Sequence, residues 1–318
     1  MLESHVMDVL RVAEKAAIAC AAWNGRGDKV SADQAATTAM RDAFNEMDFS
    51  GRIVIGEGER DEAPMLFIGE ELGRGGEEID IAVDPLEGTN LCAYNRPNAL
   101  TTIAIAPRGS LLFAPDTYMN KIAAGPACKG KIHIDKTPAE NVKAVAEALG
   151  KDVSEVNVCI LLRDRHADLI KAVYETGARV RLIDDGDVFG AIATAVAHTG
   201  IDLYLGAGGS PEGVLACAGL KAVGGEFMGR FQWRTEEERQ RALKTAEVDV
   251  DGLLTMDQLV RTDDVAFIAC GVTDGEMVDG VQITPDFTST SAVVMSATGH
   301  TVQFIKTIHR TGTGSISF

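Results

Sequence analysis

The chain has 318 residues, enough for one large or two closely packed domains with a substantial buried interior. Hydrophobic residues make up 46% and charged residues 24%, a balance that is typical of globular proteins and excludes general disorder. The 47 acidic and 30 basic residues give a net charge of −17, which argues against non-specific nucleic-acid binding because that binding needs Lys and Arg to neutralise phosphates. Any anionic ligand therefore needs local help from metal ions or selected arginines.

The cysteines and the N-terminus indicate a cytoplasmic protein. Six cysteines lie far apart without a CxxC pair, so they predict neither a zinc ribbon nor a disulfide framework. We interpret them as mostly buried thiols in a reducing cytosol. The N-terminus lacks the continuous apolar core of a signal peptide, and no stretch approaches the roughly 18 apolar residues of a membrane span.

Two helices and a strand are predicted in the first 60 residues. Helical spacing of apolar residues over 4–23 predicts the first helix, and Ser31–Gln34, which has the form of a capping box, predicts the start of the second. Asp33 then lies in the first turn, where the helix dipole favours an acid even without a function. A short strand over 52–55 leads to Glu57, which stands between two glycines, and a helix is expected to open at Pro64.

The stretch Ile79–Asn90 runs an apolar strand into two carboxylates and a hydroxyl. Pro85 has no amide hydrogen, so we expect it to end the strand just after Asp84, and the following turn presents Glu87 and Thr89. Three oxygen-bearing side chains within six residues suit hard divalent cations and phosphoryl chemistry. A strand exit with solvated acids is the plainer alternative, since acids and glycines are common in turns.

A strand over 100–106 and a loop over 116–120 follow, and Tyr118 in this loop can offer its hydroxyl to a ligand or simply pack. A helix between Pro138 and Gly150 reads as a connection. We therefore expect an N-terminal α/β domain over 1–150, with most of the candidate metal ligands, and a C-terminal α/β domain over 151–318 with ligand-binding loops.

Strands and helices alternate in the second half, as in a parallel βαβ arrangement. Strands are expected over 156–162, 179–183 and 202–205, with helices over 168–176 and 188–198. Ligands of such sheets gather at the carboxyl ends of the strands. Polar clusters follow all three strands, at 163–166, 184–187 and 206–213. Each cluster alone is explained by surface charge, a helix cap or a turn, but the topology directs them to one edge and so favours a shared site.

The glycine-rich cluster is not a nucleotide-binding fingerprint. Pro211 replaces the third glycine of G-x-G-x-x-G, and the chain contains no GK[ST] sequence. The segment does suit an anion or metal at a helix N-terminus, with Glu212 beside Pro211. Beyond a charged helix over 235–244, four antiparallel strands are expected after residue 263, and their pattern allows them to rejoin either sheet. We interpret His133, His198, His300 and His309 as structural.

Five carboxylates stand at helix starts or strand exits without a matching set of His or Cys. Oxygen-only ligation selects Mg²⁺ or Mn²⁺ over Zn²⁺ or copper. These residues are Asp33, Glu57, Asp84, Glu87 and Glu212.

The segment Asp84-Pro85-Leu86-Glu87-Gly88-Thr89 resembles the D-P-[IL]-[DE]-G-[TS] signature of the lithium-sensitive, metal-dependent sugar phosphatase superfamily. With Glu in the fourth place, the chain is most similar to class II fructose-1,6-bisphosphatases. The resemblance extends to the segments 31–34, 56–59, 163–165, 185–187 and 208–213. The superfamily's usual Trp-Asp motif is not found in the second half, where Pro211-Glu212 takes the corresponding role.

The resemblance implies a layered α-β-α-β-α sandwich with two mixed sheets and helices between and outside them. It also implies two or more Mn²⁺ or Mg²⁺ ions, one held by Asp33 and Glu57 and another by Asp84, Glu87 and Glu212, with Thr89, Glu57 and Asp33 as the catalytic residues. The expected product is fructose 6-phosphate, made in gluconeogenesis by a cytoplasmic homo-oligomer, a dimer or tetramer. Substrate contacts are implied for Glu87, Gly88, Thr89, Tyr118, Arg163, Asp164, Arg165, Asp185, Gly186, Asp187 and Gly209.

A sugar bisphosphate has two anionic ends, so metals can take the scissile 1-phosphate while Arg163 and Arg165 bind the 6-phosphate. Thr89 either attacks the phosphorus or orients a water molecule, and the sequence does not separate the two roles. Sedoheptulose 1,7-bisphosphate is an alternative or additional substrate. Two other classes stay open: an NAD-dependent oxidoreductase, which rests on the βαβ pattern, and a non-catalytic divalent-ion-binding module, which leaves the arginines and Thr89 without a role.

Overall fold

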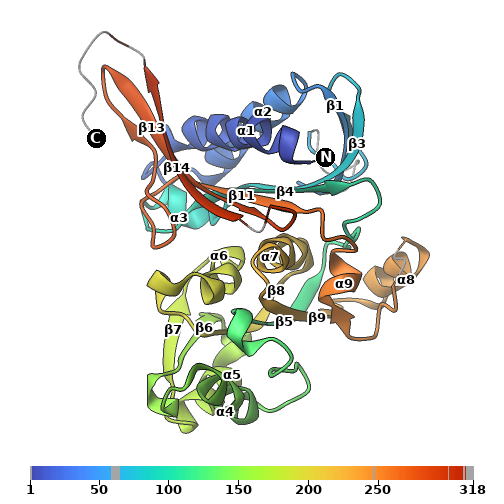
Figure 1. Cartoon of the computed structure of the whole chain (residues 1–318), viewed down its shortest axis with the longest axis vertical. Helices are drawn as coiled ribbons and strands as arrows, with labels where there is room; N and C mark the ends of the chain where they lie inside the picture. The colour runs from blue at the N-terminus through green and yellow to red at the C-terminus, as the bar shows by residue number, and fades with distance from the viewer. Residues whose placement is uncertain (1, 59–64, 246–247, 300, 311, 313–318) are drawn as a thin grey trace.

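Two mixed β-sheets are stacked with helices between them and on both outer faces in the computed structural model, which describes residues 2–58, 65–245, 248–299, 301–310 and 312 (Figure 1). This layering confirms the predicted α-β-α-β-α sandwich. Among the described residues, no helix is long and apolar enough to cross a membrane.

The first sheet has the order β12-β13-β11-β4-β3-β1-β2, and β14 pairs with β13. The pair β1–β3 is parallel, whereas the other pairs are antiparallel. The strands after residue 263 therefore extend the sheet that the N-terminal half begins. Its strands are β1 Phe49–Ile55, β2 Glu71–Leu72, β3 Glu77–Glu87, β4 Leu100–Pro107, β11 Ala266–Gly271, β12 Gln282–Ile283, β13 Phe287–Ser296 and β14 Thr301–Arg310.

The second sheet has the order β10-β9-β5-β8-β6-β7. Its β6–β7 and β6–β8 pairs are parallel, as the alternating pattern predicts, and β5 and β9 add antiparallel strands that the pattern did not indicate. The strands are β5 Tyr118–Ala124, β6 Asn157–Leu161, β7 Arg179–Ile183, β8 Leu203–Gly209, β9 Glu226–Gln232 and β10 Leu254–Thr255.

The middle helical layer is apolar on all sides because both sheets cover it. Helix α7 (Ser210–Ala222) is buried along most of its length and packs with α6 (Asp187–Ile192) in the largest hydrophobic cluster. Helices α1 (Glu3–Ala21) and α2 (Lys29–Phe44) cover the outer face of the first sheet, and α4 (Pro138–Leu149) and α5 (Ala167–Glu175) cover the second (Figure 1). The remaining helices are α3 Thr89–Ala93, α8 Glu236–Thr245 and α9 Met256–Leu259, with 3-10 turns at Pro126–Cys128, Val153–Glu155, Asp164–His166, Ala193–Ala195 and Ala197–Thr199.

All six thiols are buried and free, as predicted. Several element boundaries, however, were wrong. Helix α2 begins at Lys29 because Asp28, rather than Ser31, is its N-cap: the Asp28 carboxylate accepts from the Ser31 amide at 3.0 Å. Asp33 is therefore the fifth residue of the helix. The helix expected over 188–198 ends at Ile192 and continues as two 3-10 turns.

Three further boundaries differ between pattern and structure. Strand β3 continues past Pro85 to Glu87, because Pro85 lies in an irregular part of the ladder where no amide is needed. Tyr118 begins β5 instead of lying in a loop, and Gly206–Gly209 form the end of β8. The predicted helix start at Pro64 lies outside the described residues, and residues 65–70 form bends and turns.

Candidate active site

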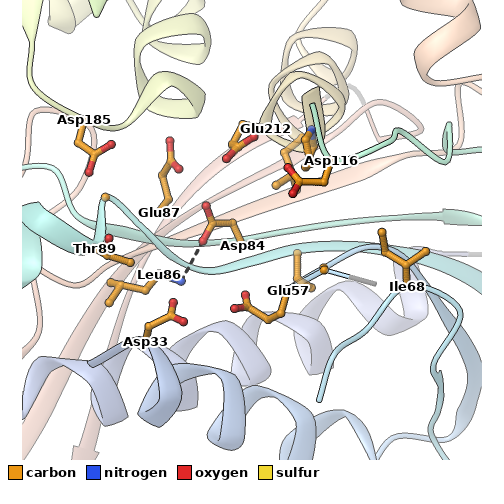
Figure 2. A pocket seen from close by; sticks show the side chains of 16 residues that line it. Asp33, Glu57, Ile68, Asp84, Leu86, Glu87, Thr89, Asp116, Asp185 and Glu212 are labelled. Carbon is orange, nitrogen blue, oxygen red and sulfur yellow. Dashed lines mark hydrogen bonds between the residues drawn. The ribbon is translucent and has the colours of Figure 1, made fainter. Parts of the chain in front are cut away.

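A cavity of about 320 Å³ opens between the first sheet and the N-terminus of α7, and it collects all five predicted carboxylates together with Thr89 (Figure 2). Residues from α2, β3 and α7 face one another across it although they are far apart in the sequence. The lining residues are Asp33, Gly56, Glu57, Gly58, Ile68, Val83, Asp84, Leu86, Glu87, Gly88, Thr89, Asp116, Asp185, Pro211, Glu212 and Leu215.

The irregular end of β3 places Asp84 and Glu87 on the same cavity. Residues three apart in a regular strand point to opposite faces. Here Asp84 pairs with Thr102 and Glu87 with Leu100, so β3 advances by three residues while β4 advances by two. The extra residue on β3 forms a β-bulge. The Leu86 amide donates to Asp84 Oδ1 at 3.0 Å and fixes the bulge. Gly88 then adopts the left-handed conformation (φ 82°, ψ 53°), which turns the chain into α3 with Thr89 as its first residue.

Helix α7 delivers Glu212 in its first turn, where the helix dipole favours a negative charge. Gly209 is needed for this approach, since a Cβ at that position would lie 1.9 Å from Glu212 Oε2. The Glu212 Oε2 atom is buried and has no hydrogen-bond partner. Burying a carboxylate oxygen without a hydrogen-bond donor costs free energy, and a bound cation or donor would offset that cost.

The five predicted carboxylates have pKa values above their ordinary range. Burial, followed by repulsion from Asp33 and Asp84, raises the pKa of Glu57 to about 9. Burial raises the pKa of Asp84 to about 7 and, together with the charge of Asp187, that of Glu212 to about 7. The pKa values of Glu87 and Asp33 are also raised, mainly by burial. The described lining contains no Lys, Arg or His to compensate these charges.

The donor set fits divalent cations of the Mg²⁺ or Mn²⁺ type. All the charged lining residues are carboxylates, and Glu212 Oε2 lacks a partner. In the described part of the chain, no three Asp, Glu, His or Cys side chains already converge on one point as a ligand set. The carboxylates of Asp33 and Glu57 lie close to each other, as do those of Asp84 and Glu87, so like charges face one another in two pairs.

Arg163, Arg165 and Tyr118 lie outside the lining of this cavity but next to it. Arg163 approaches Asp185, a lining residue, at 3.7 Å and donates to the Asp184 carbonyl at 2.6 Å. The Arg165 guanidinium donates to the Ala207 carbonyl and stacks 4.8 Å from the centre of the Tyr118 ring. Each guanidinium group is thus anchored by a backbone carbonyl. Asp164, which lies between the two arginines in the sequence, begins the 3-10 turn.

The predicted segment 185–187 divides between two environments. Asp185 lines the cavity and accepts from Asn90 at 3.3 Å. Gly186, in the left-handed conformation, precedes α6. Asp187 is buried and forms a 2.5 Å ion pair with Lys121, which is itself buried. Asp187 thus lies behind the cavity wall, where its charge is already compensated.

Three residues near the site were missed by the sequence reasoning. Asp116 lines the cavity and lies in the segment singled out only for Tyr118. Lys121 lies in the mostly buried strand β5. A single charged residue among apolar neighbours was the only feature of the sequence that could have pointed to it. Arg234 stacks 5.7 Å from the Tyr118 ring on the side of Asp116 and had no sequence signal, because the strand that leads to it was not predicted.

A known protein family matches almost the whole chain. The family described as bacterial fructose-1,6-bisphosphatase, glpX-encoded, matches residues 3–309. The match includes every site residue named above.

Individual relatives are similar along almost their whole length. The chain is 44% identical to a protein named D-fructose 1,6-bisphosphatase class 2/sedoheptulose 1,7-bisphosphatase from Thermosynechococcus vestitus, covering 95% of each chain. It is 44% identical to a protein of the same name from Prochlorococcus marinus (strain NATL1A), covering 98% of each. A solved inositol monophosphatase from Anabaena (Nostoc) sp. PCC 7120 is 14% identical to the chain with a TM-score of 0.32, over 60% of this chain and 70% of that one.

Proposed function

The chain belongs to the class II fructose-1,6-bisphosphatase family, and we propose that it hydrolyses the 1-phosphate of D-fructose 1,6-bisphosphate to give fructose 6-phosphate and phosphate. The observation that carries this proposal is a cavity whose lining contains all five carboxylates and Thr89, with two arginines beside it. Binding of a doubly anionic sugar needs both halves of that arrangement.

We propose that Asp33 and Glu57 hold one divalent ion and that Asp84, Glu87 and Glu212 hold another, with Mn²⁺ or Mg²⁺ as the metal. When bound, such ions neutralise charge on the phosphoryl group and the leaving oxygen. The carboxylates must be ionised to act as ligands, and the partnerless Glu212 Oε2 supports this role.

The protein's own side chains then orient the sugar bisphosphate. Thr89, at the first position of α3, presents its hydroxyl beside Glu87 and either attacks the phosphorus or orients the attacking water. Arg163 and Arg165 bind the 6-phosphate through charge-assisted hydrogen bonds, with Tyr118 as the platform under Arg165. Asp185 accepts from sugar hydroxyls, and Gly88 and Gly209 contact the substrate through their backbone.

Asp187, which the sequence placed among the sugar contacts, has its charge engaged by Lys121. We propose that Asp187 affects substrate binding indirectly, by holding the backbone of the segment 185–187, in which Gly186 turns the chain. We also propose that Asp164, between the two arginines in the sequence, contacts the substrate.

The test is phosphate release from fructose 1,6-bisphosphate by purified protein with Mn²⁺, with Mg²⁺ and with EDTA. We expect turnover with at least one ion and none above background with EDTA. Turnover that survives EDTA, or no turnover with either ion, would contradict the proposal.

Sedoheptulose 1,7-bisphosphate is a second candidate substrate, favoured by the names of the relatives. It shares the 1-phosphate end and has one more carbon before the second phosphate. The same assay with both sugars gives their ratio of kcat/KM. We further expect the enzyme to act in the cytoplasm as a homo-oligomer, which light scattering of the purified chain tests.

A further inference from the structure

A second cavity, of about 390 Å³, lies directly behind one wall of the active-site cavity. Its volume is in the range of small-molecule sites. The two cavities are lined by neighbouring residues of the same two segments: Val54 and Gly69 face the second cavity, while Gly56 and Ile68 face the first. The lining residues of the second cavity are Arg52, Ile53, Val54, Gly69, Gly109, Leu111, Leu112, Phe113 and Arg261.

The lining of this cavity is opposite in character to that of the active site. Among its described lining residues the charged ones are Arg52 and Arg261, both positive, and none is acidic. The other side chains are aliphatic apart from the Phe113 ring. Such a lining complements a molecule with one anionic group and an apolar body, in a protein whose overall charge otherwise repels anions.

The Arg52 side chain is fixed beside the cavity by an ion pair with Asp80. Arg52 Nη2 pairs with Asp80 Oδ1 at 2.9 Å, and the fully buried Asp80 carboxylate also accepts from the amides of Ser110 and Leu111 at 2.9 and 3.3 Å. Asp80 is thus well supplied with donors, whereas Arg52 Nε is buried and has no acceptor. An anionic oxygen is the partner that this N–H lacks.

We infer that the second cavity is a ligand site for a small anion with an apolar, preferably aromatic, body, and that its occupancy is coupled to the position of Glu57. The binding site goes beyond the proposed function, and only the coupling rests on the proposed role of Glu57 as a metal ligand.

The coupling follows from the backbone contacts of the shared wall. Gly69 N donates to the Ile53 carbonyl at 2.8 Å, and Glu57 N donates to the Leu66 carbonyl at 3.0 Å. The segments approach so closely that a Cβ on Gly56 would lie 2.0 Å from the Leu66 carbonyl oxygen. A ligand that displaces Val54 or Gly69 therefore moves the backbone that carries Glu57. By linkage, the metal must change ligand affinity by the same factor as the ligand changes metal affinity.

The probe is 8-anilinonaphthalene-1-sulfonate, an aromatic monoanion whose fluorescence rises in apolar surroundings. Titration of the intact, metal-free protein is expected to show one site per chain. The uncharged 1-anilinonaphthalene and the body-free methanesulfonate are expected to compete at least about tenfold more weakly. Equal competition by 1-anilinonaphthalene, or no binding of the probe, would overturn the site.

Two substitutions locate the probe. Arg261→Met keeps the alkyl stem and removes the charge, and Phe113→Ala removes part of the apolar wall; each is expected to weaken binding about tenfold or more. Arg11→Met, an exposed arginine on α1, is the matched control and should bind as wild type. Phe113→Ala decides the question if Arg261→Met does not fold. Unchanged binding in the folded variants would place the probe elsewhere and overturn the assignment.

Calorimetric Mg²⁺ titrations with and without saturating probe test the coupling. We expect the Mg²⁺ Kd to change by at least about threefold, with a reciprocal change in the probe Kd. An unchanged Mg²⁺ Kd would overturn the coupling. Since neither measurement uses turnover, failure here is distinct from failure of the phosphatase assay.

Discussion

Thr89 supplies a hydroxyl to a cavity in which the other polar side chains of the described lining are carboxylates. Replacing it with Ala removes the hydroxyl without removing a proposed ligand. We expect Thr89→Ala to lose at least about 100-fold in kcat, whereas Thr89→Ser keeps appreciable activity because it keeps a hydroxyl at the start of α3.

Metal affinity, measured by calorimetry, should be the same in both Thr89 variants and in wild type. A phosphate adduct on Thr89 after rapid acid quench, detected by mass spectrometry, would assign it as the nucleophile. Full activity in Thr89→Ala would exclude both roles.

At this scale the sequence predicted the acids well and their surroundings poorly. The five carboxylates line one cavity, and each stands at a strand exit or near a helix start, positions that local patterns mark. The Lys121–Asp187 pair joins β5 to α6 across 66 positions of sequence, so local periodicity carries no trace of it. Arg234 reaches Tyr118 only through the unpredicted strand β9.

At the scale of elements, the βαβ order of the second half and the antiparallel strands after residue 263 were predictable from alternation. The errors occurred where two local rules compete. Asp28 and Ser31 both suit an N-cap, and in the structure Asp28 takes that place while Ser31 donates its amide to it. Pro85 normally ends a strand, but a bulge accommodates it and lets β3 reach Glu87.

The turn from β3 into α3 yields a prediction about Gly88. Its φ of 82° favours glycine, and a Cβ would lie 2.8 Å from Leu91 Cδ1. Gly88→Ala should therefore cost about 1 kcal/mol or more of stability and shift Glu87 and Thr89, lowering kcat at least about tenfold.

Gly150, at the end of α4, is the matched control. It has a φ of 63° and open space around its Cβ position, so Gly150→Ala carries the backbone strain without reaching the site. Denaturant unfolding and kcat are measured for both variants. If both lose stability and kcat equally, the turn at Gly88 has no special role in placing the catalytic groups.

At the scale of the whole molecule, the net charge of −17 and the cluster of partly buried acids both disfavour ionisation of the cavity carboxyls. The pKa values of Glu57 (about 9), Asp84 (about 7) and Glu212 (about 7) are raised in the folded protein. The folded state therefore binds more protons than the unfolded state, in which these carboxyls are already ionised above pH 6. Without metal, the free energy of unfolding must fall as pH rises.

We expect the Tm of the EDTA-treated protein to fall by about 2 °C or more between pH 6.5 and pH 7.8, a window below the ionisation of unfolded cysteines. Added Mn²⁺ or Mg²⁺ should raise Tm more at pH 7.8 than at pH 6.5, because metal binding requires the carboxylates without their protons. Scanning calorimetry in matched buffers measures both changes.

Glu212→Gln isolates the cluster from the general charge of the surface. It removes one of the raised pKa values, so the metal-free protein should lose less stability over the same pH window, and the gain on adding metal should shrink. Glu236→Gln, on the exposed helix α8, changes the net charge equally without touching the cavity and should leave both slopes as in wild type. A metal-free Tm that stays constant or rises from pH 6.5 to pH 7.8 would show that the acids of the cavity are ionised throughout, and would remove the electrostatic argument for their role as cation ligands.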